Sequence, residues 1–146
     1  MARRRYETIK DIQNERFALN LLCQKLGSRY AWDTNGNRRG LDAILYKDHD
    51  PYCLIEVKTR NPKFFDLAKS KGYILAKQKW DKLVKLDARL VVYWKESCLF
   101  ALRPSKVSSN HIVFSTGGRT TQTRDKWDVE QMATISWEQF SLIGDK

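Results

Sequence analysis

No apolar run in this sequence approaches the roughly 18 to 20 residues that cross a membrane, and the N-terminal MARRRYETIK lacks the apolar segment of a secretory signal. Its three cysteines (Cys23, Cys53 and Cys98) are widely spaced and include no C-x-x-C pair, so neither a disulfide framework nor a zinc site is indicated. Internal repeats, low-complexity tracts and linkers are also missing. We therefore expect a single domain over residues 1–146, located in a reducing cytoplasm and not bound to a membrane.

Acidic residues are in deficit. The chain has 27 Lys and Arg against 17 Asp and Glu, a formal net charge of +10 at pH 7. A charge of this size in a chain of 146 residues favours a polyanionic partner, of which nucleic acid is the commonest. The alternative interpretation is that the charge serves solubility alone.

Apolar residues are sufficient for one core, at 42% of the chain with 5 Trp, 6 Tyr and 6 Phe. The pattern predicts α-β-β-β-α-β-β and then a β-rich tail, which is an α/β fold with a central mixed sheet flanked by helices. We expect the core to span about 7–104 and the tail to form an extension over 105–146. The predicted helices are 7–26, ended by Gly27, a short one near 64–69, and 74–88. The predicted strands are 29–34, 41–46, 52–60, 90–94, 98–103, 111–115 and one within 129–143, which a short helix follows.

Two charges interrupt the apolar strand YCLIEVKTR at residues 52–60. Side chains alternate across a strand, so Glu56 and Lys58 share a face with Leu54, while Ile55 and Val57 point to the other. An ion pair on a solvated face would explain a Glu-x-Lys pattern by itself. The preceding strand gives a reason to look further.

A hairpin between strands 41–46 and 52–60, closed by the loop 47–51, would oppose two carboxylates. In that hairpin the facing pairs are Tyr46 with Tyr52, Ile44 with Leu54, and Asp42 with Glu56. Directly opposed residues have Cβ atoms about 4.5 to 5.5 Å apart, and like charges at that spacing repel. A divalent cation between Asp42 and Glu56 would remove the repulsion, because Mg²⁺ binds through one or two carboxylates plus water and substrate phosphate. Lys58 would then lie beside the metal, next to an attacking water and the phosphate.

The first helix carries a further acid. Its apolar stripe, spaced 3, 4, 3 and 4, contains Glu15 as the one charged member: Ile12, Glu15, Leu19, Leu22 and Leu26. A carboxylate on a buried face needs a partner. Glu15 either pairs with a surface lysine at the edge of the stripe or points at the same metal.

These residues resemble the PD-(D/E)xK nuclease superfamily, in which an Asp opens one strand and Glu-x-Lys lies on the next. The chain has Asp42, thirteen residues, and then Glu56-Val57-Lys58. The element order over about 7–104 is similar to the small Holliday-junction-resolvase branch. The resemblance implies a restriction-endonuclease-like core, Asp42 and Glu56 as metal ligands with the carbonyl of Val57, Lys58 as the catalytic lysine, and Glu15 as the helix-borne acid.

Part of the motif departs from the superfamily pattern. Gln78 is placed like the Gln that some branches carry on the next helix, which implies a catalytic role for it. Lys82 stands where the RecB-type branch has Tyr, and Leu41 stands where the nominal Pro precedes the Asp.

The resemblance implies a Mg²⁺-dependent DNA endonuclease, with Mn²⁺ able to substitute, no small-molecule cofactor, and a prokaryotic or phage-infected cell as its setting. Branched DNA such as Holliday junctions is the favoured substrate, and symmetric junction cutting would require a homodimer. A nuclease for linear, single-stranded or flap DNA in repair or phage genome processing is one alternative, and a catalytically silent nucleic-acid-binding module is the other. The expected DNA contacts are Arg38, Arg39, Arg60, Lys77, Lys79, Arg119 and Arg124.

Overall fold

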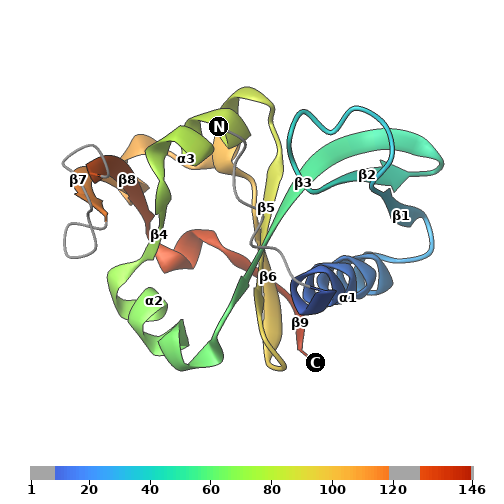
Figure 1. Ribbon diagram of the computed structural model, residues 1–146, viewed down its shortest axis with the longest axis horizontal. Coiled ribbons are helices and arrows are strands. Elements are labelled where there is room, and N and C mark those ends of the chain that lie inside the picture. The colour runs from blue at the N-terminus through green and yellow to red at the C-terminus, as the bar shows by residue number, and fades with distance from the viewer. Residues whose placement is uncertain (1–8, 119–128, 146) are drawn as a thin grey trace.

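The computed structural model of the protein describes residues 9–118 and 129–145 (Figure 1). Its main sheet has six strands, and only β3 and β5 run parallel among the neighbouring pairs described. In sheet order these strands are β1 (Tyr30–Asp33), β2 (Ala43–Lys47), β3 (Asp50–Arg60), β5 (Arg89–Trp94), β6 (Cys98–Leu102) and β9 (Ser141–Asp145). A second, antiparallel sheet contains β4 (Tyr73–Ala76), β8 (Val129–Ile135) and β7 (Ile112–Gly118). The predicted α/β class with a mixed, helix-flanked sheet is confirmed.

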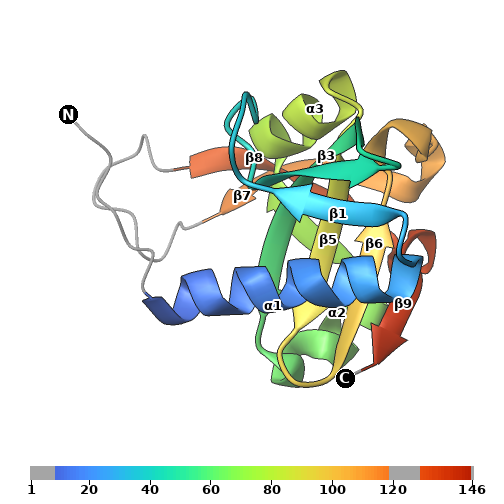
Figure 2. The same cartoon turned by 90° about the vertical axis from the view of Figure 1, so that its right-hand side faces the viewer.

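Helix α1 (Ile9–Leu26) covers one face of the main sheet (Figures 1 and 2). Its buried residues pack against the side chains of β3 that point the same way, Ile55 and Val57. The helix ends as predicted at Gly27, whose φ is +115° and whose N–H donates to the carbonyl of Cys23 at 2.9 Å. Residues 7 and 8 of the predicted helix lie outside the described residues.

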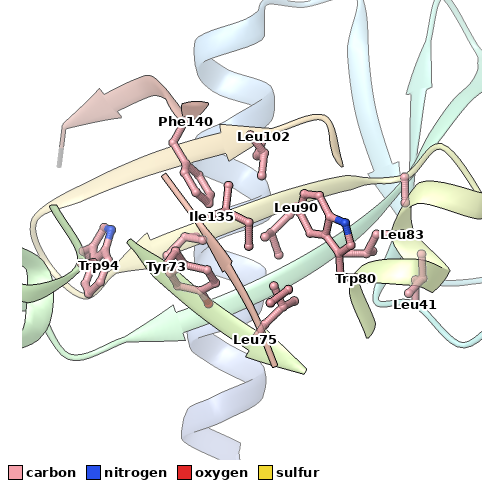
Figure 3. Close-up of a cluster of buried hydrophobic side chains, with 14 of the residues drawn as sticks. Leu41, Tyr73, Leu75, Trp80, Leu83, Leu90, Trp94, Leu102, Ile135 and Phe140 are labelled. Carbon is pink, nitrogen blue, oxygen red and sulfur yellow. The ribbon is translucent and has the colours of Figure 1, made fainter. Parts of the chain in front are cut away.

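The opposite face of the main sheet is covered by α2 (Phe65–Lys71), α3 (Lys77–Lys85) and the small sheet. Figure 3 shows the cluster buried between them, in which Trp80 and Leu83 of α3 and Leu75 of β4 meet Leu90 of β5. The tightly packed apolar interior on this side fixes α3 above the sheet. The short helix predicted near 64–69 is confirmed as α2.

The prediction of one helix over 74–88 is wrong at its start. Residues Tyr73–Ala76 form β4, which pairs antiparallel with β8, and α3 begins only at Lys77. Tyr73 and Leu75 are buried while Ile74 is 52% exposed, so the alternation has a period of two residues. Because the pairing partner lies about sixty residues further along the chain, nothing local in the sequence indicates it.

The hairpin of β2 and β3 confirms the pairing of Ile44 with Leu54 but corrects the turn. Asp48 and His49 alone form the connection, both with positive φ (54° and 73°), as in the two-residue turns that match strand twist. A bulge after Leu45 places Tyr46 opposite Pro51, so the predicted pairing of Tyr46 with Tyr52 is wrong.

The segment after residue 104 contributes to both sheets. β7 and β8 complete the small sheet, and β9, a strand that was not predicted separately, pairs with β6 at the edge of the main sheet. The short helix expected there is a single 3₁₀ turn, Trp137–Gln139. Trp137 stacks on Phe140 with ring centroids 4.5 Å apart and meets Phe100 at 4.8 Å, which joins this turn to the main sheet.

An acidic residue fastens the connection between α3 and β5. Asp87, with φ 49°, accepts hydrogen bonds from Arg103 Nη2 at 2.7 Å and from Ser105 Oγ at 2.5 Å. These two hydrogen bonds hold the pKa of Asp87 below its ordinary value, and the one from Arg103 has the larger effect.

Replacing Asp87 with asparagine is expected to lower the free energy of unfolding by about 1 kcal/mol at pH 7, because an ion pair this exposed is screened by water. A depressed folded-state pKa stabilises the fold above the unfolded pKa, and this contribution is lost as the pH falls through the folded-state pKa. The difference between the two proteins should therefore begin to shrink below about pH 4, be smaller at pH 3 than at pH 7, and vanish only below the folded-state pKa of Asp87. Urea denaturation at pH 7 and pH 3 measures this, with Asp66→Asn as control, since that side chain is 96% exposed. An equal difference at both pH values would contradict the prediction.

Candidate active site

The site is built on β3. Its residues Glu56, Lys58 and Arg60 lie beside Leu90, Val92 and Trp94 of β5, all three of which belong to the cluster under α3. The charged side chains therefore point to the face that α3 and the small sheet cover, as the alternation predicts. Glu56 lies in the most deeply buried part of the strand, and Lys58 and Arg60 follow in its half-buried end.

Asp42 is held directly in front of β2. Its backbone N–H donates to the carbonyl of Ile55 at 3.0 Å, and its Oδ2 accepts from the N–H of Val57 at 2.7 Å. Arg38 Nη1 donates to the carbonyl of Asp42 at 2.9 Å, and Leu41 anchors the segment in the core. Continuing the register of Ile44 with Leu54 places Asp42 opposite Glu56.

The electrostatics of Asp42 show that the two acids converge. Burial raises the pKa of Asp42, and the negative charge of Glu56 raises it further. The N–H of Val57 and the ammonium groups of Lys58 and Lys79 act in the opposite direction. One carboxyl group therefore interacts with a second carboxylate and two lysines.

Glu56 is the centre of this group and is only 5% exposed. Its Oε2 is 3.2 Å from Lys79 Nζ and 3.5 Å from Lys58 Nζ. Its Oε1 is buried and has no hydrogen-bond partner among the described residues. A buried carboxylate oxygen without a partner costs about 1 to 3 kcal/mol or more, so a ligand that pairs with it would be stabilised there.

Lys79 lies beside Glu56, a position that was not expected from the sequence, and its predicted role as a DNA contact stays a prediction. Lys82, one turn further, lies with its ammonium against Gly40, where a Cβ would come within 2.6 Å of Nζ. The sequence contained one signal for the position of these two lysines. Trp80 and Leu83 are three residues apart and buried on one face of α3, and Lys79 and Lys82 directly precede them on the helix.

Gln78 lies on the first turn of α3. It is exposed and, with Lys77, Asp81 and Gln131, lines a separate pocket of about 380 Å³. Lys77 Nζ is 2.8 Å from Asp81 Oδ2. The predicted catalytic role of Gln78 stays a prediction.

Glu15 is half-buried on α1, which packs on the face opposite to that of Glu56 and Lys58. Within residues 9–118 and 129–145, no three or more His, Cys, Asp or Glu side chains form a group that could hold a metal. The structure therefore does not bring Glu15 into one cluster with Asp42 and Glu56.

The arginines predicted as DNA contacts differ in their surroundings, and that role stays a prediction. Arg38 is half-buried, and Arg39, with φ 55°, is exposed in the same loop. The guanidinium of Arg60 lies over the ring of Tyr73, 5.5 Å from its centroid. Arg119 and Arg124 lie outside the described residues.

Tyr73 is a further buried residue with a polar atom close enough to Glu56 to feel its charge. Its hydroxyl has no hydrogen-bond partner in the described part of the chain. Burial raises the pKa of Tyr73 to about 12, with a smaller upward contribution from Glu56 and an opposing one from Arg60. Glu56 and Tyr73 therefore belong to one electrostatic neighbourhood.

The donor set fits a hard divalent cation. Two convergent carboxylates, one of them with a buried oxygen that lacks a partner, supply only oxygen ligands. Mg²⁺ prefers oxygen and binds proteins through one or two carboxylates while it keeps several waters. In the part of the chain that the structure describes, no third acidic side chain joins these two, which is compatible with that mode of binding.

A mixed sheet that holds an Asp ahead of one strand, opposite a Glu-x-Lys on its neighbour, is the arrangement of the PD-(D/E)xK nucleases, which are generally metal-dependent. The chain belongs to a phage endonuclease family of this kind, because the family model described as "Phage putative PDDEXK endonuclease" matches residues 1–143. No curated protein and no solved structure matches the chain. The family implies hydrolysis of phosphodiester bonds in DNA, and its match does not single out the junction-resolving branch.

Among the described helices, none is long and apolar enough to cross a membrane.

Proposed function

We propose that this protein is a Mg²⁺-dependent DNA endonuclease that cuts branched DNA, with Asp42, Glu56 and Lys58 as its catalytic group. The observation that carries the proposal is the position of Glu56, which is buried, leaves one oxygen without a partner, and raises the pKa of Asp42. Charges are rarely buried in this way for stability alone.

Each residue has a distinct task. Asp42 and Glu56 would hold the cation, and the carbonyl of Val57 is the further ligand that we propose. When bound, Mg²⁺ supplies a lowered pKa for a coordinated water and neutralises charge on the scissile phosphate and the leaving oxygen. Lys58 carries three N–H donors on a partly exposed ammonium, with which it orients the attacking water and balances the charge of the phosphate.

Branched DNA is proposed because the order of elements resembles that of the small junction resolvases. Symmetric cutting of a junction needs two active sites, so the proposal of this substrate also implies that the protein acts as a homodimer. Arg38 and Arg39 belong to the loop that ends at Asp42, and they are the residues that we propose to contact the DNA backbone near the cut.

The test is a labelled panel of four-way junction, flap, duplex, single-stranded DNA and RNA, incubated with Mg²⁺, Mn²⁺ or EDTA. We expect cleavage of the junction with either metal and none with EDTA. Preferential cutting of another DNA would contradict the proposed substrate and leave the proposed cleavage chemistry unchanged. Tight binding with no cutting of any member would show a silent binding module instead.

Lys79 offers a separate prediction. Lys79→Met removes an ammonium 3.2 Å from Glu56, which should lower the maximal cleavage rate about tenfold, because less positive charge remains near the phosphate. The same change should tighten Mg²⁺ binding severalfold, since Glu56 no longer has that competing cation. A Mg²⁺ titration of the cleavage rate separates the two effects, with Lys85→Met on the last turn of α3 as control. Unchanged half-saturation would contradict the role assigned to Lys79.

A further inference from the structure

A second recess lies next to the active site and is not used by the proposed chemistry. It is the pocket of about 380 Å³ that Lys77, Gln78, Asp81 and Gln131 line. One wall is the first turn of α3, and the other comes from the hairpin of β7 and β8, which we call the arm. The lining is polar, with two side-chain amides and one ion pair.

The arm presents an aromatic ring beside this pocket. In the arm Phe114 faces Ala133 and Thr116 faces Gln131, so Phe114 and Gln131 lie on the same side of the sheet. Phe114 is 48% exposed, and Lys77 Nζ lies over its ring at 5.3 Å from the centroid. An exposed aromatic ring is therefore next to two amides and an ammonium.

The pocket is one helix away from the catalytic group. Lys77 and Lys79 are two residues apart on α3, so they project to nearly opposite sides, one to the pocket and one to Glu56. A helix with its side chains is about 10 to 12 Å thick. A DNA strand that reaches from Glu56 to the pocket must cross the start of α3, where free backbone N–H groups and the helix dipole favour phosphate.

We propose that this pocket binds an unpaired nucleotide one or two positions from the scissile phosphate, an inference that rests on the proposed nuclease function. The base stacks on Phe114, and the amides of Gln78 and Gln131, each both donor and acceptor, bond its edge. In the structure the ammonium of Lys77 contacts both Asp81 and the ring of Phe114. When the nucleotide binds, this ammonium moves to the adjoining phosphate and uncovers the ring. A base inside a continuous duplex offers neither its face nor its pairing edge, so the pocket selects DNA with unpaired nucleotides near the cut.

The experiment measures binding without cleavage. Three fluorescein-labelled DNAs of one sequence are titrated with the protein in EDTA: a continuous duplex, the same duplex with one unpaired adenine, and the single strand. Wild type should bind the two DNAs with unpaired nucleotides about tenfold more tightly than the duplex, as one stacked base provides. Phe114→Ala should abolish this preference and leave duplex binding unchanged, whereas Phe114→Trp should keep it.

Val113→Ala is the matched control, because Val113 is the exposed neighbour that points to the other face of the arm. It should retain the preference, and thermal melting of each variant checks its fold. Equal binding of all three DNAs by wild type, or a uniform loss of affinity in Phe114→Ala, would overturn the proposal. Cleavage with Mg²⁺ is measured in parallel. Cleavage without the binding preference would contradict only the proposed nucleotide pocket. The binding preference without cleavage would contradict only the proposed nuclease activity.

Discussion

Cleavage of DNA in the presence of Mg²⁺ should fall by about 10³-fold or more when Glu56 is replaced by glutamine, because an amide cannot supply the anionic oxygen that a divalent cation requires. The change keeps the size and shape of the side chain. The free energy of unfolding should stay within about 2 kcal/mol of wild type, since the variant also removes a buried charge with one oxygen that lacks a partner. Cleavage rates and urea denaturation curves of the two proteins measure these effects.

Asp66→Asn is the control for Glu56→Gln, because it removes one carboxylate from a fully exposed position on α2. It should cut DNA at the wild-type rate. Binding in EDTA should be as tight for Glu56→Gln as for wild type, since the basic residues around the site remain. Cleavage by Glu56→Gln within a few-fold of wild type, from a preparation free of contaminating nuclease, would remove Glu56 from the catalytic group.

The lysines explain how the fold tolerates this site. Glu56 is only 5% exposed, and an uncompensated charge buried to this extent would cost several kcal/mol. Lys58 and Lys79 are partly exposed, so each keeps contact with water while it faces Glu56 Oε2. The second oxygen stays open to a ligand. The arrangement stabilises the protein without metal and still leaves Glu56 able to bind one.

The local part of the site could be read from the sequence. Asp42, Glu56 and Lys58 belong to one hairpin, whose side-chain alternation and register depend on neighbours within about fifteen residues. The bulge after Leu45 shifted only the end near the turn, and the pairing of Ile44 with Leu54, nearer the site, is the one predicted.

The non-local part could not be read. Lys79 faces Glu56 because α3 begins at Lys77, and α3 begins there because Tyr73–Ala76 are used as a strand by β8. The apolar residues Ile74 and Leu75 fit a helix equally well when β8 is not considered. Gln78, chosen from the resemblance to other nucleases, is one residue away from the position that reaches Glu56. For the same reason the stripe on α1 indicated a buried face but not which face of the sheet it would cover.

The anchoring of α3 gives the second large effect. Leu83 is 0% exposed in the cluster that also contains Leu41 and Trp80, so it joins the helix that carries Lys79 to the loop that carries Asp42 (Figure 3). Leu83→Ala should lower the free energy of unfolding by about 3 kcal/mol, from lost burial and the cavity that remains. For a chain of this size that corresponds to a melting temperature roughly 10 °C lower.

Activity should respond to Leu83→Ala as well, even at temperatures where the variant is folded, because the two halves of the site are no longer held at a fixed spacing. Val84→Ala is the matched control: it removes a branched side chain from the next position, which is 38% exposed, and should cost about 1 kcal/mol or less with normal cleavage. Differential scanning calorimetry and cleavage rates at 20 to 25 °C compare the three proteins. Equal destabilisation by both substitutions would show that Leu83 is not the contact that sets α3 in place, and normal cleavage by a destabilised Leu83→Ala would show that the catalytic group keeps its spacing without it.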